Sequence, residues 1–194
     1  MQSDSGLNNC PAAVEELEKE TRKLITQFLT DFAVQSAPRL SDGKALSTMK
    51  RVVDGLCEKH RYKYNGMIQN MALYHKEEDV AFVSAVAASL FEDCTVTWGR
   101  IASLMAFGAV VCKHLTERGS ENSAEQVGQE ISSYLLSHHR GWMLENNSWD
   151  GFAEYFQAAE PEMTMRNTLI SLAGLAGLGA TLALFIKVFQ RILQ

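Results

Sequence analysis

The chain has 194 residues, of which 46% are hydrophobic and 21% are charged, and its formal net charge is −5. This length suffices for one ordinary domain, and this composition is typical of a chain that folds rather than of a disordered one. The acidic balance offers phosphates no broad basic surface, which argues against a nucleic-acid partner.

The cysteines and the N-terminal residues favour a reducing compartment. The four cysteines lie far apart, and none stands at a zinc-site spacing from another cysteine or a histidine. The first residues contain no apolar run, so we expect no signal peptide and no secretion. Residues 1–13 are predicted to be a flexible leader.

Two amphipathic helices are predicted in the first half of the chain. Over residues 14–32 the apolar side chains recur at helical spacing on one face, with charges between them. Proline and glycine interrupt the pattern at 36–43, and a second helical segment then runs from Leu46 to Met71. Gly55 and Gly66 are expected to loosen or bend this segment.

A buried helix is predicted near the middle of the chain. Residues 80–91 form a third helix, and a polar corner at 92–97 follows, where Thr95 or Thr97 is expected to cap the next helix. Residues 101–112 then carry no charge, and a helix that is apolar on every side is buried on every side. Twelve residues are too few to span a bilayer, so this segment is predicted to be the core helix of the domain.

The remaining helices complete one domain. An amphipathic pattern covers residues 124–136, and short helical pieces follow around Trp142 and Trp149. No segment alternates apolar and polar residues as a strand does. We therefore expect an all-α domain over residues 14–160, a bundle of seven to eight helices around a central apolar helix.

A membrane anchor is predicted at the C-terminus. Residues 167–186 form a charge-free run of 20 residues, which is the length that a bilayer core requires. Lys187 and Arg191 follow directly, so the anchor, taken as residues 167–189, ends close to the C-terminus. The alternative is a core helix or a segment that folds back onto the protein. As an anchor it would be inserted after synthesis, leaving the helical domain at the cytosolic face of an organelle.

No catalytic motif is found, so an enzyme is not expected, nor is a cofactor or a metal. His138 and His139 are adjacent and would point about 100° apart on a helix, so they do not form a ligand pair. The sequence contains none of the common metalloprotease, serine hydrolase, P-loop or dinucleotide-binding motifs.

Two short motifs have the character of sites. Thr97-Trp98-Gly99-Arg100 places a cation at the start of the buried helix, where the guanidinium and the helix N-terminus would together favour a carboxylate. The alternative is that Arg100 only caps the helix or stacks on Trp98. The second motif, residues 149–152, is a helix start with two aromatic residues, which by itself indicates a packing corner.

Together these motifs resemble the Bcl-2 family of apoptosis regulators. The first and second homology regions of that family are similar to Trp98-Gly99-Arg100-Ile101 with Ala106-Phe107-Gly108-Ala109, and to Trp149-Asp150-Gly151-Phe152. Residues 46–55 resemble the third region, with its Asp-Gly pair at Asp54-Gly55, and the tail resembles the family's anchor. Within the family, the motifs are most similar to the myeloid-cell-leukaemia type of survival protein.

The resemblance implies a groove that binds the amphipathic death helix of pro-apoptotic relatives. Arg100 would pair with an aspartate of that helix, and the partner's apolar residues would fill pockets along the groove. The implied function is anti-apoptotic, at the mitochondrial outer membrane, with the endoplasmic reticulum and the cytosol as further locations. The residues implied to bind the partner helix are Arg100, Gly99, Thr97, His60, Tyr64, Met67, Met71, Val83, Val86, Leu90, Asp93, Leu104 and Phe107.

Several residues depart from the family's pattern, among them Met49, which stands where a leucine is usual. Thr97 replaces the usual asparagine, Ser148 replaces a glycine, and Val53 stands where a small residue is usual. A bulky Val53 would hinder this segment from docking into another protein's groove, which favours a receptor over a donor. The competing interpretation is a pore-forming executioner of the same fold, since a fold alone does not fix function.

Overall fold

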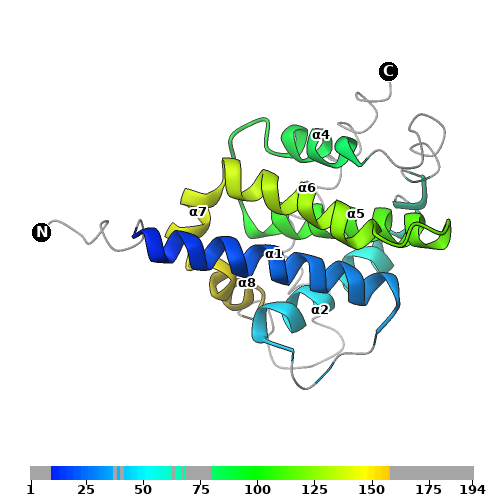
Figure 1. The fold of residues 1–194 in the computed structure, drawn as a ribbon, viewed down its shortest axis with the longest axis horizontal. Coiled ribbons are helices and arrows are strands. Elements are labelled where there is room, and N and C mark those ends of the chain that lie inside the picture. The colour runs from blue at the N-terminus through cyan, green and yellow to red at the C-terminus, as the bar shows by residue number, and fades with distance from the viewer. Residues whose placement is uncertain are drawn as a thin grey trace, which may run out of the picture.

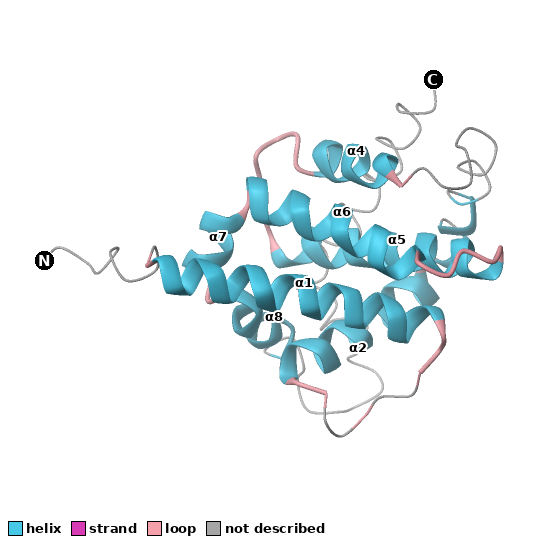
Figure 2. Ribbon diagram, viewed as in Figure 1, coloured by secondary structure: helices cyan, strands magenta, loops and turns pink. Residues whose placement is uncertain are grey.

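The structure, a computed structural model, describes residues 10–36, 39, 42–62, 64–66, 68 and 80–157. In Figure 1, α1 and α6 run side by side, with α4 on one side of them and α2 and α8 on the other. Figure 2 shows helices and connecting loops and no strand in the described part of the chain, which confirms the all-α prediction. The described helices are α1 (Pro11–Ala33), α2 (Lys44–Lys59), α4 (Ala81–Leu90), α5 (Trp98–Glu117), α6 (Ser123–His138), α7 (Arg140–Glu145) and α8 (Ser148–Gln157).

The central helix of the bundle is α5, which packs against α1, α2, α4 and α6. Within the charge-free stretch 101–112, only Val110 is more than marginally exposed, so the predicted core helix is confirmed. Burying one leucine or phenylalanine side chain contributes roughly 1.5–3 kcal/mol, and α5 buries several. Gly108 lets α6 come close, because a Cβ at this position would lie 2.4 Å from Cδ1 of Ile131.

The amphipathic helix α1 covers one side of α5 and α6. It begins at Pro11 rather than at residue 14, because the fixed φ of proline suits the first turn of a helix and its missing N–H costs nothing there. Its apolar stripe is buried, and Thr21 within that stripe accepts a hydrogen bond of 2.8 Å from the indole N–H of Trp149. Both side chains are fully buried, so this bond joins α1 to α8 inside the core.

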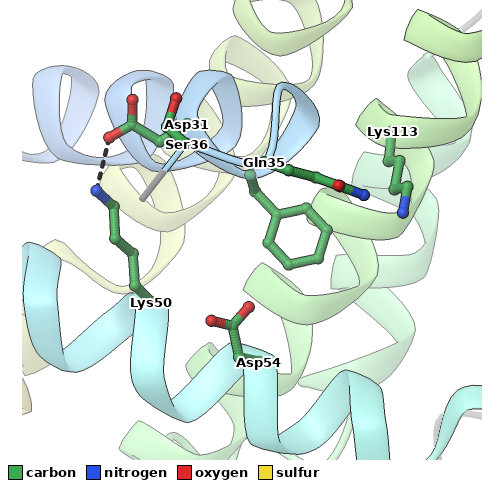
Figure 3. Close-up of a pocket in the computed structure, with 7 residues that line it drawn as sticks. Asp31, Gln35, Ser36, Lys50, Asp54 and Lys113 are labelled. Atoms are coloured by element: carbon green, nitrogen blue, oxygen red, sulfur yellow. Dashed lines mark ion pairs between the residues drawn. The ribbon is translucent and has the colours of Figure 1, made fainter. Parts of the chain in front are cut away.

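A buried cation holds α2 in the bundle. The ammonium of Lys50 lies 2.7 Å from the carboxylate of Asp31 on α1 and 2.6 Å from that of Asp42, which precedes α2. Figure 3 shows the first of these ion pairs at the edge of a cavity. The Lys50 side chain is 10% exposed, and burial of a charge is tolerated only with such partners. One face of α2 therefore stays packed, with Val53 fully buried.

Two predictions, on the length of the second helical segment and on the C-terminal anchor, are not confirmed by the described residues. The second segment does not continue unbroken to residue 71, because α2 ends at Lys59, and Gly55 lies inside this helix without ending it. The predicted anchor, residues 167–189, lies outside the described residues. Among the residues that are described, no helix combines the length and the apolar character needed to cross a bilayer.

Candidate functional site at the start of the central helix

The corner between α4 and α5 brings several predicted site residues together. Thr97 is the N-cap of α5, and its hydroxyl accepts a hydrogen bond of 3.2 Å from the backbone N–H of Arg100. This confirms Thr97, rather than Thr95, as the capping residue. Such a cap satisfies a donor that the first helical turn would otherwise leave unpaired. Because the hydroxyl of Thr97 caps the helix, the side chain of Arg100 is left for other partners.

Arg100 makes a two-pronged ion pair with Asp93, which lies in the preceding corner. Nη1 and Nη2 of the guanidinium each meet one carboxylate oxygen, the second pair at 2.7 Å. Nη1 also donates to the backbone oxygens of Leu90, at 3.1 Å, and Thr95, at 2.8 Å. The hydrogen bonds from Arg100 hold the pKa of the Asp93 carboxyl well below its usual range. The predicted attraction of a carboxylate to this position is therefore already met within the chain.

The two partners of this pair differ in exposure. The side chain of Arg100 is 12% exposed, whereas that of Asp93 is 53% exposed. Arg100 is fixed by the two backbone carbonyl oxygens and by its place on α5, while Asp93 lies on a solvated loop. Solvent reaches mainly the Asp93 side of this pair and screens it in part. The site is thus a fixed cation whose anion lies on the solvent side.

The other predicted residues on α4 and α5 lie behind this corner. Phe107 stacks edge-on against Phe82 of α4, with ring centroids 6.1 Å apart. Gly99 is buried too, and its backbone oxygen accepts a hydrogen bond from Ser103. Four further predicted residues are at most 1% exposed in this structure, namely Val83, Val86, Leu90 and Leu104. The structure thus places them in the hydrophobic core, and their binding role stays a prediction.

The residues predicted from the second segment lie elsewhere or outside the described structure. His60 is the C-cap residue of α2 and is half-buried. Tyr64 is 2% exposed and lines a cavity with residues of α1 and the later turns of α5, not the corner at Arg100. Met67 and Met71 lie outside the described residues.

The second aromatic motif forms a packing corner, as its pattern indicated. Trp149 and Phe152 are fully buried, and Trp98 packs against both. Gly151 is required by a close approach, since a Cβ there would lie 1.9 Å from the backbone oxygen of Asn146. The motif therefore anchors α8 to the start of α5, and of its four residues only Asp150 is exposed.

Sequence reasoning missed the buried polar contacts made by Thr21 and Lys50. Both stand within the apolar stripes of their helices, Thr21 four residues after Leu17 and Lys50 four residues after Leu46. A polar residue on a buried stripe needs a partner, so this spacing was a usable signal. The identities of the partners, far away in sequence or in the α1–α2 connection, could not be read from it.

Comparisons with known proteins agree on one family. Residues 49–149 match the model of the Bcl-2 family, described as apoptosis regulator proteins. The anti-apoptotic protein NR13 of Coturnix japonica is 25% identical over 176 residues, covering 88% of this chain and 98% of the relative. The apoptosis regulator Bcl-2 of Cricetulus griseus is 28% identical over 144 residues, covering 72% of this chain and 60% of the relative.

A solved structure shows the same fold. The apo form of the zebrafish pro-survival protein NRZ superposes with a TM-score of 0.67 at 22% sequence identity. The match covers 75% of this chain and 96% of the zebrafish chain. Likeness at this level of identity establishes the arrangement of the helices and leaves the roles of side chains to be argued from this chain.

Proposed function

Since the chain belongs to the Bcl-2 family of apoptosis regulators, we propose that it is a survival-promoting member that sequesters the amphipathic death helix of pro-apoptotic relatives. The observation that carries the proposal is the fixed cation at Arg100, whose anion, Asp93, is half exposed to solvent. An aspartate of a bound helix would take the place of Asp93 and gain the same two-pronged geometry. The apolar residues of that helix would then pack against α4 and α5.

The packing of α2 supports a receptor over a donor. A donor must release its own third-region helix, here α2, so that another protein can bind it. In this chain Val53 and Met49 are fully buried, and Lys50 is tied to two carboxylates. Releasing α2 would expose this apolar face and separate Lys50 from Asp31 of α1. Similar proteins that are named anti-apoptotic or pro-survival also support a survival-promoting role.

Peptide binding by the full-length protein tests the proposal. With a synthetic death-helix peptide, Arg100→Ala should weaken affinity at least about tenfold, because a charge-assisted hydrogen-bonded pair is lost. Against a peptide whose aspartate is changed to alanine, the same substitution should cost little more. Asp93→Asn should not weaken binding of the aspartate peptide, since it removes only the carboxylate of this chain that competes with the peptide for Arg100. Arg140→Ala, which breaks an exposed pair with Glu18, is the matched control.

If Arg100→Ala weakens the affinity for both peptides equally, the result counts against the groove. Arg100 would then only hold the corner between α4 and α5 together. The direction of the effect on cell death needs a second assay. Adding the protein to isolated mitochondria with a death-activating peptide should reduce cytochrome c release. Release caused by the protein alone would instead support the pore-forming alternative.

We also infer that residues 167–189 anchor the protein in the mitochondrial outer membrane, with the helical domain in the cytosol. The support is the charge-free run 167–186 followed by Lys187 and Arg191. Ending the chain before Asn167 should move the protein from the membrane fraction to the cytosolic fraction while leaving peptide affinity unchanged. Full-length protein found wholly in the cytosolic fraction would contradict the anchor.

A further inference from the structure

A cavity on a second face of the bundle is independent of the corner at Arg100. Its volume is about 450 Å³, and it lies between the end of α1, the C-terminal part of α2 with the residues after it, and the later turns of α5. This is within the range of about 300–1,000 Å³ usual for small-molecule pockets. We name it the rear cavity, and its walls include Phe32, Cys57, Tyr64, Ile68, Val110 and Lys113.

Helical geometry separates the rear cavity from the proposed groove. Arg100, Leu104 and Phe107 follow one stripe of α5, whereas Val110, Lys113 and Glu117 follow another. At 3.6 residues per turn, the two stripes lie roughly 110° apart around the helix. A ligand in the rear cavity would therefore not occupy the groove beside Arg100.

The walls of the rear cavity are mostly apolar. Phe32, Ile68 and Val110 contribute hydrocarbon surface. Burial raises the pKa of the Cys57 thiol to about 12, so Cys57 is a neutral thiol at physiological pH and acts as a small apolar side chain. Such walls suit the apolar body of a ligand.

A buried hydroxyl in the same walls has no hydrogen-bond partner within the described part of the chain. The side-chain oxygen of Tyr64 is buried, and it makes no hydrogen bond within the structure described. Burial raises the pKa of Tyr64, so the hydroxyl keeps its proton and is available as a donor. A buried polar atom without a partner is costly, and a ligand with an acceptor atom would relieve that cost.

Lys113, a cation with no ion pair among the described residues, stands at the edge of the rear cavity. Lys113 is half-buried on α5, and no carboxylate among the described residues lies within ion-pair distance of it. Together with Phe32, it also lines an adjoining cavity of about 340 Å³. Figure 3 shows Lys113 reaching from α5 into this adjoining space, across from Asp54 of α2. Lys113 therefore lines both cavities.

The other charges of the rear cavity lie nearer to solvent. Glu58, Arg61 and Glu117 are exposed, whereas Lys113 is half-buried. Burial and the nearby Arg118 lower the pKa of His114, so this ring is neutral near pH 7. Because an interaction weakens with exposure to water, the half-buried Lys113 is the least screened of these four charges.

From the apolar walls, the buried hydroxyl of Tyr64 and the cation of Lys113, we propose that the rear cavity is a binding site for an anionic amphiphile. This ligand is an apolar chain that carries one carboxylate. The chain would lie against Phe32, Ile68 and Val110, the carboxylate would pair with Lys113, and the hydroxyl of Tyr64 would donate a hydrogen bond to it. Such a ligand would bridge α1, α2 and α5 and stabilise their packing.

Photolabelling of the full-length protein in phosphatidylcholine vesicles tests the site. The probe is decanoate carrying a diazirine on its chain, and labelled peptides are identified by mass spectrometry. Label is expected on the segments around Tyr64 and Val110. Excess decanoate should remove it, and the uncharged decanamide should compete at least about fivefold less well, because it cannot pair with the ammonium.

Matched variants separate charge from shape. Lys113→Met keeps the side-chain length and should reduce labelling at least about fivefold, whereas Lys113→Arg keeps the charge and should retain it. Tyr64→Phe removes only the hydroxyl and should reduce labelling about threefold. Lys59→Met, at the exposed end of α2, is the control and should change nothing. Arg100→Ala should also leave labelling unchanged.

Three results would overturn the proposal. They are equal labelling of wild type and Lys113→Met, equal competition by decanoate and decanamide, and label found along the stripe of Arg100 and Phe107. If Lys113→Met alters the circular dichroism spectrum, the comparison of Tyr64→Phe with wild type and the decanamide competition still decide the question.

Discussion

Replacing Thr21 with valine tests whether the hydrogen bond between α1 and α8 holds the bundle together. Thr21 accepts a 2.8 Å hydrogen bond from the indole of Trp149, and both side chains are 0% exposed. Valine has nearly the same shape, so the substitution removes the acceptor without opening a cavity. The indole N–H is then left buried and unpaired, which costs about 1–3 kcal/mol.

Thr21→Ser is the matched control, because it keeps the hydroxyl and removes one methyl group. Deleting a buried methylene-sized group costs about 0.8 kcal/mol in transfer free energy, with a further contribution from the small void. If the hydrogen bond matters as argued, valine should therefore destabilise the protein at least as much as serine does, although valine is the more apolar residue.

Urea denaturation followed by tryptophan fluorescence measures the effect. For a small protein the free energy of unfolding falls by about 1–3 kcal/mol per molar urea, so a 2 kcal/mol loss lowers the midpoint by about 1 M. Peptide affinity should be unchanged in native buffer, since Thr21 is not among the side-chain partners of Arg100, which are Asp93 and the backbone oxygens of Leu90 and Thr95. A Thr21→Val midpoint equal to or above that of wild type would refute the reasoning about the unpaired indole.

Three further predictions concern stability. Ser148→Gly should stabilise the protein by about 0.5–1 kcal/mol in thermal unfolding, because Ser148 has a φ of 49°, in the left-handed region that favours glycine. Gly151→Ala should lower the free energy of unfolding by about 1–3 kcal/mol, since its Cβ would collide with the backbone oxygen of Asn146; an unchanged melting temperature would contradict this. The hydrogen bond from Lys50 lowers the pKa of the Asp42 carboxyl below its ordinary value of 3.8. The pair therefore contributes its full stabilisation to the folded protein above pH 3.8, and this stabilisation is lost as the pH falls through the lowered pKa of Asp42 in the folded state. Asp42→Asn should therefore be less stable at pH 6 and show a smaller loss of stability on acidification below pH 4, and parallel pH profiles would count against the pair.

The sequence by itself determined the helical architecture and the identity of the core. Periodicity fixes which face of a helix is apolar, and a charge-free stretch such as residues 101–112 has no face that favours water, so it is enclosed in any fold. Capping is equally local, and the cap could be narrowed to Thr95 or Thr97 because a hydroxyl just before a helix satisfies a backbone donor nearby in the chain; the structure shows that it is Thr97. The motifs around Arg100 and Trp149 likewise led to the family, since they are short and contiguous.

Only the tertiary structure decided which side chains meet. Arg100 could be expected to attract a carboxylate, but that Asp93 already fills this role depends on how the corner between α4 and α5 closes. The partners of Lys50 and Thr21 come from other helices or loops, with Trp149 separated from Thr21 by 128 residues. The rear cavity exists because α1, α2 and α5 converge around Tyr64 and Lys113, and no local pattern records that convergence. Long-range contacts depend on the angles and offsets at which helices pack, which are set by the fit of whole surfaces and not by any one segment.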